Sequence, residues 1–203
     1  MLGKMRRICY ILVIVSNICF FFSCNSPKKE LQDAIEQMQS RKIAIPYEQM
    51  NCWANDSILK VSPWEKAKLK LVHYIDSATC SSCYLQKVKM NDYLFRMEEL
   101  SNNEFYNVII INPGNKMNEE LEKLFSEKLI PQTIFIDSTN NFAQVNPNIP
   151  HETKYHTFLV DDNNKVILVG NPIVNKKIKD IFMSIVEERL GIKLNVKNLD
   201  KLR

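Results

Sequence analysis

Glycine is scarce in this chain, and the loops that glycine builds around phosphate groups are missing. Only four of the 203 residues are glycine. Neither G-x-G-x-x-G nor G-x-x-x-x-G-K-[ST] occurs in the sequence, and these are the patterns that bring a backbone close to a nucleotide's phosphates. The sequence therefore gives no support to a nucleotide enzyme of the Rossmann or P-loop class.

An excess of positive charge is also lacking once the first residues are set aside. The formal net charge is +4, but three of the 27 Lys and Arg residues (Lys4, Arg6 and Arg7) stand in residues 1–23, which contain no acid. The remainder has 24 basic residues against 23 acidic ones. Proteins that bind nucleic acid usually carry a basic surface, so we expect no nucleic-acid partner.

Residues 1–23 have the three parts of a bacterial export signal. The three bases precede an apolar run over residues 8–22, and the small residue Ser23 stands directly before Cys24. The run is shorter than the roughly 20 apolar residues of a membrane-spanning helix. The order resembles the lipobox of bacterial lipoproteins, which implies that Cys24 is acylated and becomes the mature N-terminus. We expect a lipid-anchored protein that faces the periplasm, on the outer membrane rather than the inner one; an uncleaved anchor stays open as the alternative.

Composition divides the chain into four parts. We expect a signal peptide at residues 1–23, a lipidated cysteine with a polar tether at 24–42, a folded domain at 43–192 and a loosely held tail at 193–203. Within the tether, residues 28–40 are polar and helix-forming.

The predicted elements follow the order of an α/β protein. A short strand between residues 43 and 53 contains Pro46 and is expected near a sheet edge. His73 and Tyr74 are interpreted as packing residues of a buried strand. The polar residues 161–165 suit the turn of an antiparallel hairpin. Strands are predicted at 68–75, 105–112, 133–137, 157–160 and 166–169, and helices at 84–100, from 118 to 129 and at 178–190 with Gly191 at its end.

Six cysteines are present, two of them within residues 1–23. With Cys24 acylated, Cys52, Cys80 and Cys83 remain in a compartment that oxidises thiols. An odd number there suggests one disulfide and one leftover cysteine. We interpret Cys52 as a small buried residue of the core.

Cys80 and Cys83 form a C-x-x-C pair where a buried strand passes into a helix. Their spacing puts the two sulfur atoms one helical turn apart. Cys80 is expected at the helix N-terminus, where backbone N–H groups and the helix dipole favour its thiolate. Cys80 is therefore the predicted nucleophile. Cys83, one turn further in and expected to be more buried, is predicted to attack the mixed disulfide and release the reduced substrate.

The Cys pair and the order of elements together resemble the thioredoxin superfamily. Residues 74–86 (YIDSATCSSCYLQ) and 155–172 (YHTFLVDDNNKVILVGNP) look, more narrowly, like the TlpA-like or redoxin-type lipoproteins of Bacteroidetes. The resemblance covers roughly residues 66–190. It implies a thioredoxin-like α/β fold, with a central mixed sheet flanked by helices and a C-terminal β-hairpin and helix.

The sequence departs from this family just before the predicted hairpin. Thioredoxins place a cis-proline there, against the Cys pair, whereas here Tyr155 stands at that position and His156 follows. Because alternate strand residues point to opposite faces, we expect Tyr155 to lie against the disulfide and His156 to approach from the side. Both are candidates for substrate binding or proton transfer. Asp76 is a further candidate for proton transfer from Cys83, although we favour for it a role as the cap of the following turn.

These features indicate a thiol-disulfide oxidoreductase that uses Cys80 and Cys83 on exported proteins. The TlpA-like resemblance implies a reductant supplied by a membrane electron donor, and we expect neither cofactor nor metal. Two alternatives stay open. One is a copper- or zinc-binding module in which a histidine near the hairpin joins the Cys pair, with Cys52 or His151 as the fourth ligand that zinc would require. The other is a catalytically silent interaction domain of the cell envelope.

Overall fold

The computed structural model describes residues 27–54, 57–58, 64, 67–89, 93–114 and 133–192. The expected signal peptide, Cys24, the helix expected from residue 118 and the C-terminal tail lie outside these residues. The chain's contacts separate it into two units, residues 1–34 and residues 35–203. The second unit holds everything described below, and helix α2 (Pro27–Gln39) runs across the boundary. No helix among the described residues is long and apolar enough to cross a membrane.

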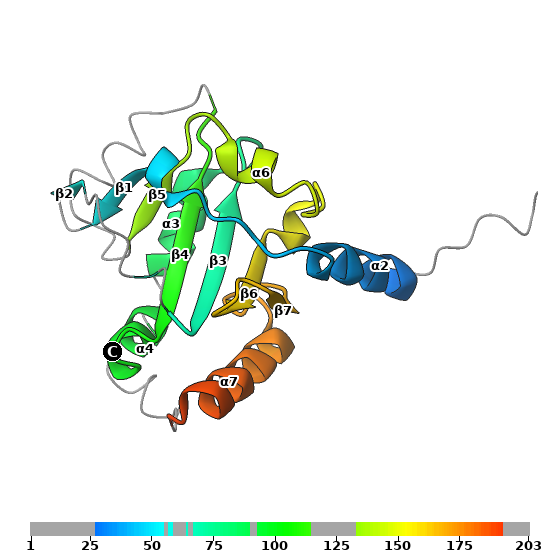
Figure 1. Ribbon diagram of the computed structural model, residues 1–203, viewed down its shortest axis with the longest axis vertical. Helices are drawn as coiled ribbons and strands as arrows, with labels where there is room; N and C mark the ends of the chain where they lie inside the picture. Colours follow the sequence, from blue (N-terminus) through cyan, green and yellow to red (C-terminus); the bar gives the residue numbers. More distant parts are fainter. Residues whose placement is uncertain are drawn as a thin grey trace, which may run out of the picture. The chain divides into compact units, whose positions relative to one another are not determined.

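The described residues of the second unit form a mixed sheet of seven strands in the order β2-β1-β5-β4-β3-β6-β7 (Figure 1). Parallel pairing joins β3 to β4 and β4 to β5, whereas β1 pairs antiparallel with β5 and β6 pairs antiparallel with β3 and β7. This confirms the central mixed sheet with a C-terminal hairpin. The strands are β1 (Asn51–Ala54), β2 (Ser57–Ile58), β3 (Leu69–Ile75), β4 (Phe105–Ile111), β5 (Ile134–Ile136), β6 (Thr157–Asp161) and β7 (Val166–Val169).

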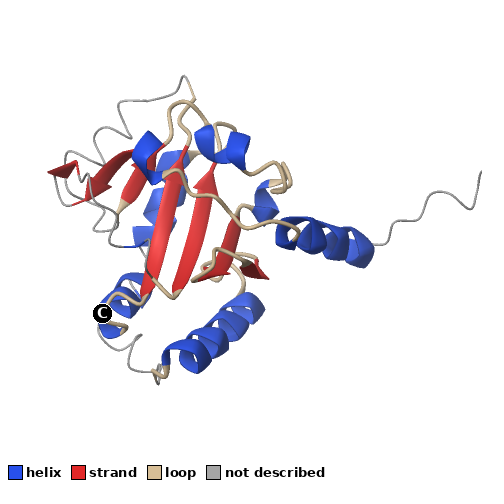
Figure 2. Cartoon of the chain, viewed as in Figure 1, coloured by secondary structure: helices blue, strands red, loops and turns tan. Residues whose placement is uncertain are grey.

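The three parallel strands lie in the middle of the sheet, where both of their faces are buried, and most of their residues are apolar. All seven residues of β3 and all three of β5 are buried. A strand with two buried faces needs helices on both sides of the sheet, and Figure 2 shows helices on both.

One face of the sheet is covered by α3 (Ser81–Lys89), α4 (Tyr93–Leu100) and α7 (Lys176–Leu190). Leu69 and Leu71 of β3 belong to a buried cluster with residues of α4 and α7, and Ile75 clusters with Leu85 and Val88 of α3. On the other face, the Tyr74 ring lies 5.1 Å from the Phe142 ring of α6 (Asn141–Val145). Alternation along β3 therefore sends its odd-numbered residues toward the face that α3, α4 and α7 cover.

The helices differ from the sequence prediction in two places. The helix predicted to open at the Cys pair begins at Ser81, as expected, but the described residues up to Leu100 belong to two helices, α3 and α4, where one was expected. Helix α6 and the 3-10 turn η4 (Thr153–Tyr155) between β5 and β6 were not expected. Asp137 explains α6, since its two carboxylate oxygens accept hydrogen bonds from the N–H groups of Asn141 and Phe142, each at 2.8 Å.

Candidate functional site

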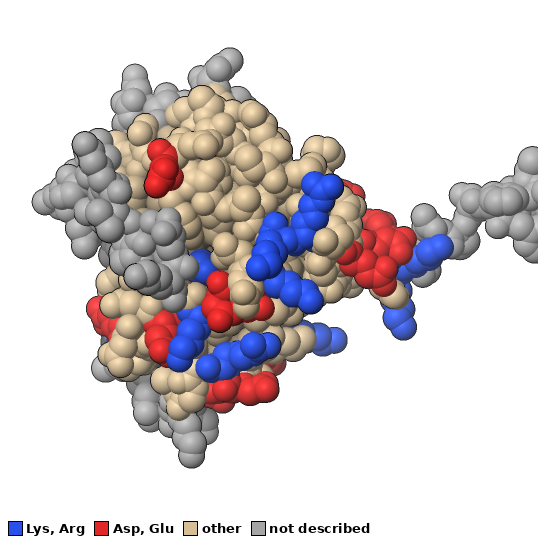
Figure 3. All heavy atoms as spheres, in the orientation of Figure 1, with Lys and Arg blue, Asp and Glu red and all other residues tan. Residues whose placement is uncertain are grey.

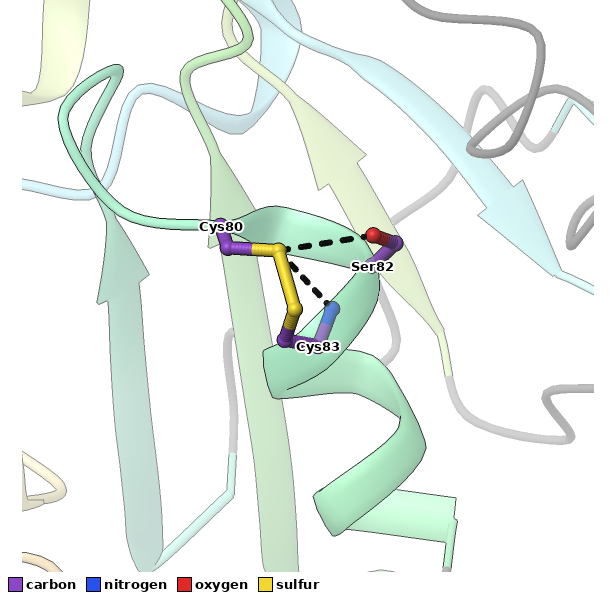
Figure 4. Close-up of a disulfide and its surroundings, with 3 residues drawn as sticks. All are labelled: Cys80, Ser82 and Cys83. Atoms are coloured by element: carbon purple, nitrogen blue, oxygen red, sulfur yellow. Dashed lines mark hydrogen bonds between the residues drawn. A yellow bond between two sulfur atoms is a disulfide. The ribbon is translucent and has the colours of Figure 1, made fainter.

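Cys80 and Cys83 form a disulfide at the N-terminus of α3, as the spacing predicted (Figure 4). Their Cα atoms lie 5.4 Å apart. The Tyr84 N–H donates to the Cys80 carbonyl, which makes Cys80 the residue that begins the helix. Both cysteines are exposed, so the expected burial of Cys83 is not found. The disulfide is accessible to another polypeptide from outside.

The sulfur of Cys80 is surrounded by hydrogen-bond donors of the first helical turn. The Cys83 N–H donates to Cys80 Sγ at 3.4 Å. The Ser82 hydroxyl lies 3.5 Å from the same sulfur, and it is the donor in the disulfide form because neither sulfur then carries a proton. Donors at a helix N-terminus stabilise a negative charge on sulfur. The same geometry will therefore favour a thiolate at Cys80 once the disulfide is reduced.

Asp76 caps the turn that leads into Cys80, which confirms the role favoured for it from the sequence. Its Oδ1 atom accepts hydrogen bonds from the Ala78 N–H, the Thr79 N–H and the Thr79 hydroxyl, at 3.2, 2.9 and 2.7 Å. Its Oδ2 atom lies 3.7 Å from Nδ1 of His156. The carboxylate thus touches both the cysteine loop and the residue before β6.

His156 is buried and has a defined tautomer when neutral. Its Nε2 atom lies 3.0 Å from the Pro150 carbonyl oxygen, and since a carbonyl can only accept, Nε2 carries the proton. Nδ1 is then a bare acceptor, and it has no hydrogen-bond partner among the described atoms. Burial lowers the pKa of His156, while the Pro150 hydrogen bond and the Asp76 charge oppose this. The ring is therefore held toward its neutral form.

Tyr155 and His156 do not alternate as strand residues, because β6 begins only at Thr157. Tyr155 ends the 3-10 turn η4 and His156 follows as its cap, so the period-two argument applied to them was wrong. Tyr155 is buried, with the Lys154 ammonium 4.8 Å from its ring centre. Its contact with the disulfide stays a prediction.

His73 does more than pack, contrary to the sequence interpretation. It is fully buried on β3, and its Nε2 atom lies 2.8 Å from Asn107 Oδ1 on β4. Its Nδ1 atom lies 2.6 Å from the hydroxyl of Tyr84, the residue directly after Cys83. Burial lowers the pKa of His73 to about 4. The neutral ring thus donates to Asn107 and accepts from Tyr84.

Two further side chains complete this buried network at Tyr84. Asn171, after β7, donates from Nδ2 to the Tyr84 oxygen at 3.0 Å. Thr157, opposite His73 in the β3–β6 register, lies 3.3 Å from the same oxygen. The residues of this network come from β3, α3, β4, β6 and the loop after β7. No spacing in the sequence could therefore indicate that they form hydrogen bonds with one another. The network attaches the cysteine helix to the sheet beneath it.

A metal site is not assembled in the part of the chain that the structure describes. No group of three or more His, Cys, Asp or Glu side chains there is placed to hold an ion. Cys52, the remaining cysteine of the described residues, is buried in β1, as expected.

No protein-family model and no curated protein matches the chain. Among solved structures it is similar to an uncharacterized thioredoxin-like protein from Porphyromonas gingivalis, with 11% identity over 74% of this chain and 94% of that one and a TM-score of 0.48. A thioredoxin-like protein from Bacteroides caccae has 15% identity, covers 78% of this chain and 53% of its own, and gives a TM-score of 0.45. The thioredoxin domain of a thiol-disulfide oxidoreductase from Bacteroides vulgatus has 13% identity to this chain. The match covers 70% of this chain and 97% of that one, with a TM-score of 0.44. The strand order, the helix that follows β3 and the C-x-x-C disulfide at its start make the fold of this chain thioredoxin-like.

Proposed function

We propose that this protein is a lipid-anchored thiol-disulfide oxidoreductase of the periplasm that reduces disulfides in exported proteins. The observation that carries the proposal is the exposed Cys80–Cys83 disulfide, whose Cys80 sulfur accepts the Cys83 N–H at the start of α3. A disulfide that served only stability would gain nothing from an exposed, donor-rich helix N-terminus. The export signal and Cys24 support the compartment and the anchor.

The proposed exchange begins from the dithiol form. The Cys80 thiolate attacks one sulfur of a substrate disulfide, that S–S bond breaks, and one substrate thiolate leaves. Cys83 then loses its proton and attacks the Cys80 sulfur, which releases the second substrate thiolate. Two electrons pass to the substrate and the Cys80–Cys83 disulfide forms. A dithiol donor in the membrane restores the starting state by the reverse exchange.

Asp76, Tyr155 and His156 are the residues proposed to bind substrate or move protons beside this pair. The position of Asp76 supports its inclusion, because one carboxylate contacts both Thr79, next to Cys80, and His156. Burial lowers the pKa of His156, so its ring is held toward the neutral form and can accept a hydrogen bond at Nδ1, beside that carboxylate. This supports a role for His156 in substrate binding or proton transfer.

Trapping of mixed disulfides tests the exchange. In cells that express the full chain, Cys83→Ser should accumulate covalent adducts with other exported proteins on non-reducing gels, and Cys80→Ser should accumulate none. Cys52→Ser is the matched control, because this buried cysteine lies outside the pair. Equal trapping by the two site variants, or none by either, would favour a silent interaction domain.

The reduction potential of the pair tests the direction of electron flow. A value near that of thioredoxin, about −270 mV, is expected for a reductant. A value near about −120 mV would make the protein an oxidant and overturn the proposed direction.

A further inference from the structure

A cavity of about 460 Å³ lies on the sheet face opposite α3, at the carboxyl end of β3. Asp76 is the carboxylate in its wall, and none of the described residues that line it is Lys or Arg. Helix α6, whose sequence NFAQV has no charged residue, contributes to the wall and appears as an uncharged area in Figure 3. The cavity is lined by Tyr74, Asp76, Asn112, Asn140, Gln144 and His156, among others.

Two hydrogen-bond acceptors in this wall face each other without a donor between them. Among the described residues, none donates a hydrogen bond to His156 Nδ1. The neutral ring carries its proton on Nε2, which points at Pro150, so Nδ1 can only accept. Asp76 Oδ2 lies 3.7 Å away, while Oδ1 is occupied by its three donors in the turn. The side chain of His156 is only 7% exposed. An unpaired buried acceptor carries a desolvation cost that a donor would remove.

Three amides of the wall, those of Asn140, Gln144 and Asn146, already form hydrogen bonds within the protein. The Tyr74 hydroxyl donates to Asn140 Oδ1 at 2.7 Å, and Gln144 Nε2 donates to the Thr139 carbonyl at 2.9 Å. Asn146 donates from Nδ2 to two backbone carbonyls and accepts at Oδ1 from the Ala44 N–H. Ser77, Asn112 and His151 also line the cavity. His156 Nδ1 and Asp76 Oδ2 are the pair of acceptors that face each other across a short distance, and one of them is anionic. A nitrogen at about 2.9 Å from each would satisfy both at once.

We propose that this cavity binds the cationic side chain, Lys or Arg, of the polypeptide whose disulfide is exchanged at Cys80. The inference rests on the proposed function and names a substrate class for it. An ammonium or guanidinium group supplies several N–H donors, and its positive charge complements the negative charge of the Asp76 carboxylate. An acidic or apolar side chain would leave both acceptors unpaired.

The cavity is close enough to Cys80 for a substrate to reach both. The Thr79 N–H donates to the Asp76 carbonyl, so these two residues close a turn in which their Cα atoms lie within about 7 Å. Cys80 is one residue further, about 3.8 Å between Cα atoms. A basic residue a few positions from the substrate cysteine would therefore fit.

Binding of short peptides to the full chain in its disulfide form tests the proposal without any exchange. The probes are peptides of five residues without cysteine, capped at both ends, whose central residue is Arg, Lys or Gln. Calorimetry should show the Arg and Lys peptides binding at least tenfold more tightly than the Gln peptide. Equal affinity for the three peptides would overturn the proposal.

Variants locate the binding in the cavity. Asp76→Asn keeps an oxygen to accept from the turn but removes the charge, and it should reduce the affinity for the Arg peptide to that for the Gln peptide. Asp162→Asn, the same change in the exposed β6–β7 turn, should leave it unchanged. If Asp76→Asn does not fold, His156→Ala should show the same loss. Full affinity in the folded Asp76→Asn variant, or in His156→Ala, would contradict the assignment.

A small amine without a peptide shows whether the cavity binds a substrate side chain or any free ammonium ion. We expect n-butylammonium to bind at least tenfold more weakly than the Lys peptide, because only the peptide also contacts the surface around the cavity. Equal affinity would assign the cavity to a small free amine and overturn the substrate assignment. Because these peptides hold no cysteine, a failure here is distinct from a failure of the trapping experiment, which tests the exchange itself.

Discussion

The hydroxyl of Tyr84 lies 2.6 Å from Nδ1 of His73, so the residue that follows Cys83 is hydrogen-bonded to a strand, β3, in the interior of the sheet. His73 stands on the middle strand of the β4-β3-β6 group and is fully buried. The bond joins the helix that carries the disulfide to the strand that precedes it. Movement of α3 against β3 would break this short hydrogen bond and leave His73 Nδ1 with only the longer contact to Thr157, at 3.5 Å, so the bond opposes such movement.

Replacing Tyr84 by Phe should destabilise the protein. The substitution leaves His73 Nδ1 and Asn171 Nδ2 without this partner, and an unsatisfied buried polar group costs about 1–3 kcal/mol. Tyr93→Phe is the matched control, because the Tyr93 hydroxyl is buried and has no hydrogen-bond partner among the residues that the structure describes. Urea denaturation should show a lower free energy of unfolding for Tyr84→Phe and no loss for Tyr93→Phe. Equal effects would mean that the network contributes nothing.

The titration of His73 should make the protein less stable in acid. Burial lowers its pKa from 6.5 to about 4, so the unfolded chain binds a proton that the folded chain does not. The contribution of His73 to stability is complete above pH 6.5 and declines toward pH 4, by up to about 3 kcal/mol. His73→Gln, which cannot titrate, should show a weaker loss of unfolding free energy over that range. The same pH slope in both proteins would contradict this.

The titration of Glu98 should make the protein less stable as the pH rises, the opposite of the effect of His73. Burial raises its pKa from 4.5 to about 7, although its Oε1 atom accepts the Asn107 N–H at 2.6 Å. The folded chain then holds a proton that the unfolded chain releases, so its stabilising contribution is complete below pH 4.5 and is lost as the pH rises through about 7. That loss amounts to about 3 kcal/mol. Glu98→Gln should remove it, so that the variant gains stability over the parent as the pH rises from 4.5 to 7.5. A constant difference between the two proteins would rule out this titration.

The Cys80 thiol should be acidic. Its sulfur accepts the Cys83 N–H and lies beside the Ser82 hydroxyl, and both interactions favour the thiolate. In Cys83→Ser, the alkylation rate of Cys80 plotted against pH should have its midpoint below the ordinary thiol value of about 8.5. Adding Ser82→Ala should move the midpoint upward. A midpoint at or above 8.5 would contradict a nucleophile activated by the helix.

Processing should depend on Cys24. Residues 8–22 are the predicted apolar part of an export signal, and a small residue and a cysteine follow them. If that prediction holds, Cys24→Ala should leave the unprocessed precursor in the membrane fraction. Metabolic labelling with a fatty acid should mark the parent chain and not the variant. A variant that is cleaved and located like the parent would show that Cys24 is not acylated.

The amino-acid sequence by itself determined the sheet, the hairpin and the position of the cysteines. Strands β3, β4 and β5 are mostly apolar, interrupted by Lys70 and His73 in β3 and by Asn107 in β4. Such segments indicate strands buried on both faces without reference to any neighbour. The two-residue interval between Cys80 and Cys83 requires only a helical turn, so the disulfide also follows from local spacing. Gly191, with φ +66°, ends α7 where the sequence placed it.

Tertiary structure alone decided which polar side chains meet. His156 faces Asp76 from 80 residues away in the sequence, and His73 meets Asn107 and Thr157 through the register of three strands. Asn171, in the loop after β7, reaches the Tyr84 hydroxyl that also bonds to His73. Periodicity in a sequence indicates which face of an element is apolar, because that depends on neighbours three or four residues away in a helix and two away in a strand. It does not indicate which buried polar atoms lie opposite each other, since that depends on strand order and register. For this reason the disulfide was predictable, while the network beneath it and the cavity beside it were not.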